Sequence, residues 1–137
     1  MSEALKKNRP EFRNINAITD LPNYRWPLAS LVSGAHRIAG LLLVLLLPLI
    51  LFLLDKSLTS EISFEYFKGF TSGWFVKLLI LALSWAYLHH FCAGIRHLLM
   101  DVHVGLDKDT ARKSAAWVFA ISLPLAALVA LKLFGVF

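Results

Sequence analysis

Three long runs of apolar residues dominate the chain, and polar segments separate them. They extend over about residues 28–54, 73–101 and 115–137. About 20 residues of α-helix cross a hydrocarbon core of about 30 Å, so each run is long enough to span a bilayer. Residues 40–54 also lack the polar stripe that a helix on the surface of a soluble bundle would carry. The pattern therefore predicts an all-α membrane protein with three transmembrane helices.

The composition supports a single membrane domain preceded by a polar arm. The 137 residues are 58% hydrophobic, and we expect an N-terminal arm at residues 1–26 and a transmembrane domain at 27–137. The arm lacks the apolar core of a cleavable signal peptide, so the first span is expected to direct insertion. Cys92 is the only cysteine, which excludes an intrachain disulfide. No soluble catalytic domain is predicted, and chemistry on a water-soluble substrate would require another polypeptide.

The distribution of basic residues predicts the topology. The first loop between spans carries Lys56 and Lys68. The other basic side chains outside the spans gather before the first span and between the second and third: Lys6, Lys7, Arg9, Arg13 and Arg25, then Lys108, Arg112 and Lys113. Because cytoplasmic segments are enriched in Lys and Arg, the N-terminus is expected in the cytoplasm and the C-terminus on the opposite side. The net charge of +5 follows from this arrangement, so no nucleic-acid partner is expected.

Ionisable residues interrupt the second apolar run. A charged group at the centre of a membrane helix costs roughly 2.5–3.5 kcal/mol on insertion scales, so such residues usually face a cofactor, a partner or water. His90, Gly94, His97 and Asp101 fall on one helical face, because seven residues make nearly two turns. A haem would suit this face, since imidazole can bind iron axially and Gly94 leaves space.

The same spacing leaves alternatives open. His89 and Arg96 are also seven residues apart, on a face rotated by about 100°. Geometry alone therefore does not choose between His89 and His90 as a ligand. Buried polar packing between helices or a proton relay would also explain these residues.

A second polar cluster lies near the start of the first span. Ser33, His36 and Arg37 occur at positions i, i+3 and i+4, so they share one helical face. They could hydrogen-bond a quinone carbonyl or pair with haem propionates. The alternative is an interfacial anchor in which Arg37 reaches lipid phosphate. Two polar clusters near one membrane face favour a shared site.

Three segments together resemble the cytochrome b subunit of succinate dehydrogenase, the larger membrane anchor of respiratory complex II. They are Lys-Lys-Asn-Arg-Pro at 6–10, Ser-Gly-Ala-His-Arg-Ile-Ala-Gly at 33–40, and His-Phe-Cys-Ala-Gly-Ile-Arg-His-Leu-Leu-Met-Asp at 90–101. The resemblance covers nearly the whole chain. It implies half of a heterodimeric, haem-binding helical bundle in the bacterial inner membrane, with a cytoplasmic N-terminus and a periplasmic C-terminus.

The resemblance also implies roles for individual residues. His90 corresponds to the axial ligand of haem b, while the small anchor subunit supplies the other ligand. Ser33 and Arg37 correspond to quinone-binding positions, and His36, Arg37 and His97 to residues near the haem propionates. Asp101, together with His103, would assist proton access from the cytoplasm. No catalytic residue of the dehydrogenase reaction is expected in this chain.

The function implied is that of a non-dehydrogenase subunit of succinate:ubiquinone oxidoreductase, in the respiratory chain and the tricarboxylic acid cycle. A flavoprotein subunit would oxidise succinate, and an iron-sulfur subunit, met by the N-terminal arm, would pass electrons to ubiquinone. A fumarate reductase anchor that uses menaquinone is one alternative. A non-redox assembly subunit, whose polar residues only pair helices, is another.

Overall fold

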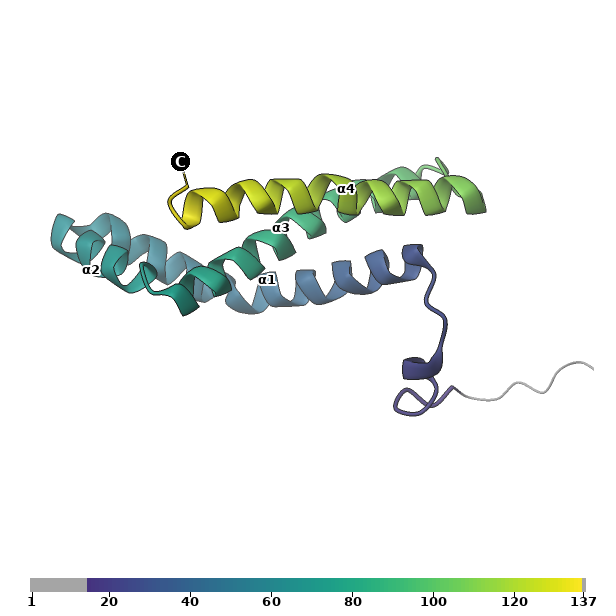
Figure 1. Cartoon of the computed structure of the whole chain (residues 1–137), viewed down its shortest axis with the longest axis horizontal. Coiled ribbons are helices and arrows are strands. Elements are labelled where there is room, and N and C mark those ends of the chain that lie inside the picture. The colour runs from purple at the N-terminus through teal and green to yellow at the C-terminus, as the bar shows by residue number, and fades with distance from the viewer. Residues whose placement is uncertain (1–14, 137) are drawn as a thin grey trace, which may run out of the picture.

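The computed structural model describes residues 15–136 and is helical throughout its regular structure. A 3-10 turn, η1 (Leu21–Asn23), precedes four α-helices: α1 (Leu28–Thr59), α2 (Glu61–Thr71), α3 (Trp74–Asp101) and α4 (Lys108–Leu133) (Figure 1). The helices α1, α3 and α4 are long and apolar enough to cross a membrane. The prediction of an all-α protein with three spans is therefore confirmed, although the short helix α2 was not expected.

Two of the spanning helices extend beyond their apolar runs. Helix α1 continues to Thr59, and α4 begins at Lys108 rather than near residue 115. The early start of α4 has a local cause, because the side chain of Asp107 accepts a hydrogen bond from the backbone N–H of Thr110. Such an N-cap satisfies an N–H group that would otherwise lack a partner in the first turn. Polar first turns of this kind suit the membrane interface.

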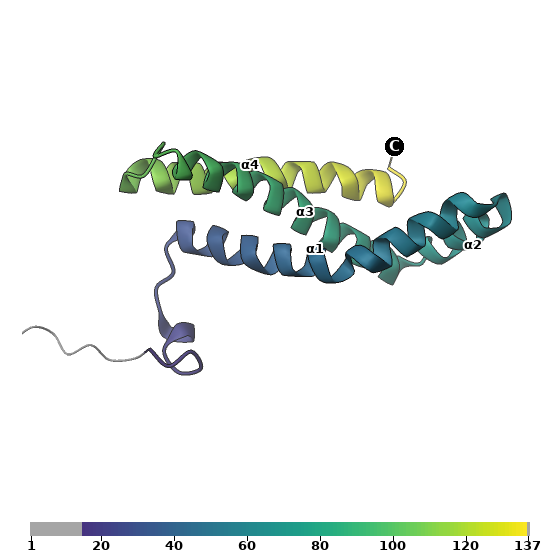
Figure 2. The ribbon, with the colours of Figure 1, turned by 180° about the vertical axis from the view of Figure 1, so that it is seen from behind.

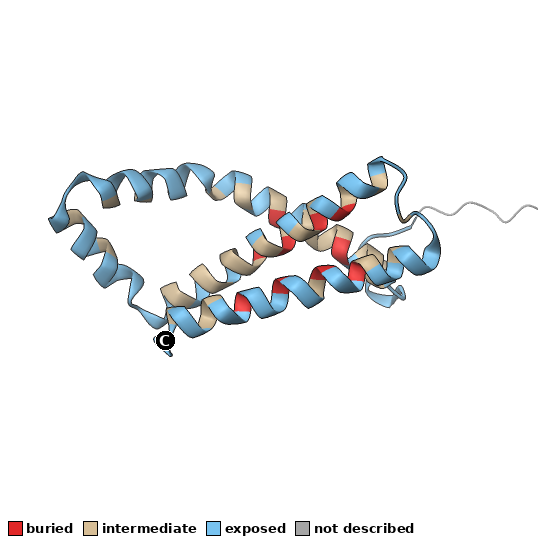
Figure 3. Ribbon diagram, turned by 90° about the horizontal axis from the view of Figure 1, so that it is seen from above, coloured by how far each residue is buried: buried red, intermediate tan, exposed pale blue. Residues whose placement is uncertain are grey.

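Helix α3 is the central element, since it packs against both α1 and α4 along the bundle (Figures 1 and 2). The core where the three helices meet consists of Val32, Ala93, Ala115 and Val118. Small side chains at these positions let helix backbones approach closely, which is how membrane helices associate without a hydrophobic driving force. Figure 3 shows that the buried residues gather in this crossing region, whereas the end that carries α2 is exposed.

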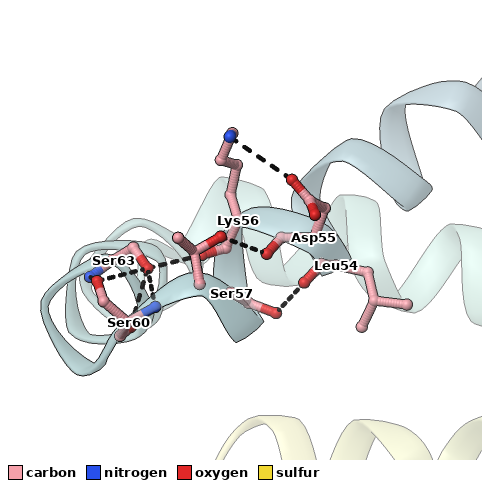
Figure 4. Close-up of polar contacts among 7 residues, drawn as sticks. Leu54, Asp55, Lys56, Ser57, Ser60 and Ser63 are labelled. Atoms are coloured by element: carbon pink, nitrogen blue, oxygen red, sulfur yellow. Dashed lines mark hydrogen bonds and ion pairs between the residues drawn. The ribbon is translucent and has the colours of Figure 1, made fainter.

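Hydrogen bonds tie α2 to the end of α1. Ser60 and Ser63 form a reciprocal capping box, in which each side-chain oxygen accepts a hydrogen bond from the backbone N–H of the other residue, at 3.1 Å. The Ser63 hydroxyl also donates to the carbonyl oxygen of Lys56 at 2.6 Å (Figure 4). These contacts satisfy groups exposed by two adjoining helix ends. The connection between the first two spans is therefore an ordered helical corner.

Candidate functional site

His90 faces α1 and is held there by a backbone hydrogen bond. Its Nδ1 lies 3.1 Å from the carbonyl oxygen of His36. Because a carbonyl can only accept, Nδ1 carries the proton, and the neutral imidazole keeps its lone pair on Nε2. This second nitrogen makes no hydrogen bond to any residue in 15–136. His90 is thus oriented through one nitrogen and leaves the other available.

Gly40 on α1 makes room for the His90 ring. A Cβ atom added at Gly40 would lie 2.8 Å from Cε1 of His90 and 3.3 Å from Nδ1. Real Cβ atoms essentially never approach another heavy atom so closely, so any larger residue would displace the imidazole. The glycine therefore allows the two helices to approach at the height of His90.

Three histidines from two helices form a cluster. The His36 ring stacks on that of His90 with centroids 4.1 Å apart and planes 6° apart. The His97 ring lies 5.0 Å from His36 at a tilt of 45°. Gly94 borders the same cluster, since a Cβ there would lie 3.6 Å from Nε2 of His36. His90, Gly94 and His97 therefore share one face of α3, as their spacing indicated, and this face contacts His36 on α1.

The other residues expected at this site lie near the cluster residues along the chain, on α1 and at the end of α3. Ser33 is half-buried and Arg37 is exposed on α1, and neither forms a hydrogen bond or an ion pair with a residue of the described chain. Asp101 is exposed at the last residue of α3, and His103 is exposed in the turn that follows. The structure brings His36, His90 and His97 together, and the side chains of Ser33 and Arg37 have no polar partner among the described residues.

His89 points into a different part of the molecule. Its side chain is 1% exposed, and its Nε2 lies 3.4 Å from the carbonyl oxygen of Val32. The ring is flanked by Trp85 and Phe119, with centroid distances of 5.4 and 5.3 Å. His89 therefore belongs to the three-helix core, and the two adjacent histidines occupy separate environments.

Arg96 is a buried residue to which the sequence analysis assigned no role. It is 7% exposed, and its Nε donates to the Ser114 hydroxyl at 2.9 Å while Nη2 donates to the Ala111 carbonyl at 3.4 Å. Neutral oxygens on α4 thus satisfy a guanidinium on α3. The seven-residue spacing between His89 and Arg96 was the available signal, because it places Arg96 on the core face.

Comparison with known proteins identifies relatives of the chain. The family model described as succinate dehydrogenase/fumarate reductase transmembrane subunit matches residues 6–129. A succinate dehydrogenase cytochrome b556 subunit of Paracoccus denitrificans is 31% identical over 134 residues, which cover 98% of each chain. The protein of the same name from Coxiella burnetii is 36% identical over 105 residues, covering 75% of this chain and 83% of the relative. The chain therefore belongs to the succinate dehydrogenase/fumarate reductase transmembrane subunit family.

Proposed function

We propose that this chain is a membrane-anchor subunit of succinate:ubiquinone oxidoreductase that binds haem b and contributes to the quinone-reduction site. The observation that carries the proposal is the match along 98% of the chain to a cytochrome b556 subunit, a name that denotes a b-type haem protein. The three membrane-spanning helices agree with an anchor.

His90 is the proposed axial ligand of the haem iron from this chain. Histidine ligands typically donate one ring N–H to a backbone carbonyl or carboxylate, which fixes the tautomer and orients the ring. His90 has this arrangement, because Nδ1 meets the His36 carbonyl and Nε2 is left for a metal. His89 also has one ring nitrogen against a backbone carbonyl, that of Val32, but its side chain is 1% exposed and its other nitrogen, Nδ1, is buried inside the three-helix core.

The remaining haem contacts would come from both sides of a subunit interface. When bound, haem b supplies one-electron transfer. Two imidazoles on one helix cannot bind opposite faces of one iron, which leaves His36 or a partner subunit as the source of the second axial ligand. The resemblance to the family favours the small anchor subunit. His36 and His97 border His90, and the exposed guanidinium of Arg37 is suited to pair with haem propionates.

Ser33 and Arg37 are the proposed quinone contacts. They are four residues apart on α1 and therefore project from one face, close to the helix N-terminus. The Ser33 hydroxyl would donate to a quinone carbonyl, and Arg37 would stabilise the negative charge that develops on reduction. Asp101 and His103 would help to deliver the two protons that ubiquinol formation consumes.

The chemistry would be divided among subunits. Oxidation of succinate to fumarate releases two electrons and two protons in the flavoprotein subunit. The iron-sulfur subunit would pass the electrons to ubiquinone at a pocket formed with both anchors, and this chain would contribute no dehydrogenase residue. By the distribution of basic residues, the N-terminus would lie in the cytoplasm of a bacterium and the C-terminus in the periplasm.

One alternative has a specific observation in its favour. The matching family description names fumarate reductase as well as succinate dehydrogenase. A fumarate reductase anchor would run the reaction in the reverse direction, with menaquinol as the reductant. The two assignments differ in the quinone and in the direction of electron flow.

Purification of the intact complex through a tag on this chain tests the proposal. We expect the flavoprotein, iron-sulfur and small anchor subunits to copurify, and the reduced-minus-oxidised spectrum to show a b-type haem band. The complex should reduce ubiquinone with succinate. A purified complex without haem or without a flavoprotein would refute the assignment, and menaquinol-dependent fumarate reduction with no ubiquinone reduction would favour the alternative.

A further inference from the structure

Three buried polar atoms in the core have no hydrogen-bond partner within residues 15–136: Nε1 of Trp85, Nδ1 of His89 and the hydroxyl oxygen of Ser122. The His89 side chain is 1% exposed and Ser122 is 0% exposed. Buried polar atoms are nearly always hydrogen-bonded, to protein or to ordered water. Three exceptions in one core therefore require a common explanation.

The register of α3 against α4 indicates that the three residues lie close to one another between these helices. Trp85 and His89 are one turn apart on α3, with ring centroids at 5.4 Å. Contacts of Arg96 with Ser114 and of His89 with Phe119 define the antiparallel register of the two helices. This register places Ser122 opposite the turn of α3 between Trp85 and His89. Trp85 also lines one cavity with Leu123 and Ala126, which lie one and four residues after Ser122 on α4.

The hydrogen-bonding capacities of the three atoms are complementary to those of water. The indole N–H of Trp85 can only donate. Nε2 of His89 carries a proton, because it lies against the Val32 carbonyl, so Nδ1 of the neutral ring can only accept. The Ser122 hydroxyl can do both. A metal ion would be repelled by the indole N–H, and an anion by the lone pair on Nδ1.

We propose that one ordered water molecule binds between Trp85, His89 and Ser122. It accepts a hydrogen bond from Nε1 of Trp85, donates one to Nδ1 of His89, and makes its third bond with the Ser122 hydroxyl. Buried waters typically make about three such bonds. The inference does not rest on the proposed haem function, because all three partners lie within this chain.

The bound water gives His89 a fixed chemical state. With Nε2 donating to Val32 and Nδ1 accepting from water, both ring nitrogens have a partner and neither is available for a metal. The neighbouring His90 retains a free Nε2. The water site would therefore keep two adjacent histidines chemically distinct.

A structure of the intact complex at a resolution that shows ordered waters tests the proposal. We expect one peak within about 2.7–3.2 Å of all three atoms. The peak should disappear in the double variant Trp85→Phe, Ser122→Ala and remain in the control Ser84→Ala, which changes a half-buried serine of α3 outside the cluster. No peak in a wild-type map that shows other buried waters would overturn the proposal. A peak that persists in the double variant would also overturn it.

A spectroscopic measurement gives an independent test of the same site. In a complex labelled with ¹⁵N-histidine, Nδ1 of His89 should show the chemical shift of a hydrogen-bonded acceptor nitrogen. The signal should move toward that of a free imine nitrogen in the double variant. A protonated Nδ1 in the wild-type protein would contradict the assigned tautomer and the water site with it.

Discussion

The imidazole rings of His36 and His90 lie almost parallel, 4.1 Å apart, and the backbone carbonyl of His36 meets Nδ1 of His90. His36 thus contacts the His90 ring twice: its side chain packs on the face of the ring, and its backbone carbonyl meets the edge. This double contact holds His90 in one orientation while its Nε2 is left free. The first two predictions depend on this arrangement.

Replacing His90 should open a coordination position on the haem iron. In His90→Ala, we expect the b-type haem either to be lost or to bind carbon monoxide after reduction, because one of two axial ligands is missing. The control His89→Gln should keep a haem that does not bind carbon monoxide. Spectra of purified complexes check both variants. An unaltered haem in His90→Ala, or an opened one in His89→Gln, would contradict the assignment.

Gly40→Ala should lower haem occupancy, although Gly40 is not itself a proposed haem contact. The added methyl group would lie 2.8 Å from Cε1 of His90 and would displace the ring. Changes to groups that orient a metal ligand typically cost about 10–100-fold in affinity or activity, and we expect haem occupancy to fall accordingly. Gly34→Ala is the matched control, since no atom lies within 4 Å of its new Cβ. Equal haem content in both variants would exclude the proposed contact.

Substitution of the quinone contacts should separate two activities. Arg37→Ala is expected to lower succinate:quinone reductase activity by about 100-fold or more, the scale for loss of a group that stabilises developing negative charge. Ser33→Ala should lower it as well. Succinate oxidation with an artificial acceptor should be retained in both. Arg112→Ala, an exposed arginine on α4, serves as the control. Undiminished quinone reduction in both variants would rule out this pocket.

Arg96 is expected to stabilise the packing of α3 on α4. The coupling between Arg96→Ala and Ser114→Ala in a double-mutant cycle should be about 0.6–1.7 kcal/mol, the range for hydrogen bonds between membrane helices. The measurement is the free energy of unfolding in detergent. Additive effects of the two substitutions would show that the 2.9 Å contact contributes nothing to stability.

Asp107 should make the stability of the bundle depend on pH in the acid range. Hydrogen bonds from the side chain and the backbone N–H of Thr110 hold the pKa of its carboxyl below the usual value. The pKa is thus lower in the folded than in the unfolded state, so the stabilisation is present above the unfolded pKa and is lost as pH falls through the folded one. Asp107→Asn keeps a capping oxygen that does not titrate.

Thermal unfolding of the two proteins at a series of acidic pH values checks this prediction. The wild-type midpoint should fall more steeply with decreasing pH than that of Asp107→Asn. Parallel curves would mean that the carboxylate is not linked to folding.

The sequence predicted the three spans because long apolar runs determine them, and helical periodicity placed His90, Gly94 and His97 on one face. Periodicity could not separate His89 from His90, because that choice depends on which helix packs on which side of α3. The packing of Arg96 against Ser114 also depends on the register between two helices. Helix α2 was missed because its ends are set by local serine hydrogen bonds rather than by a hydrophobic pattern.

The separate environments of His89 and His90 have a consequence for how the sequence can diverge. Substitutions at position 89 should covary with Trp85, Phe119 and Ser122, whereas those at position 90 should covary with His36 and Gly40. A single-residue insertion in α3 before this pair would rotate it by about 100°, so that His89 would take the direction of His90 and His90 would turn to the direction of Phe91. Length variation in this family should therefore be tolerated in the connections between helices and be rare within α3.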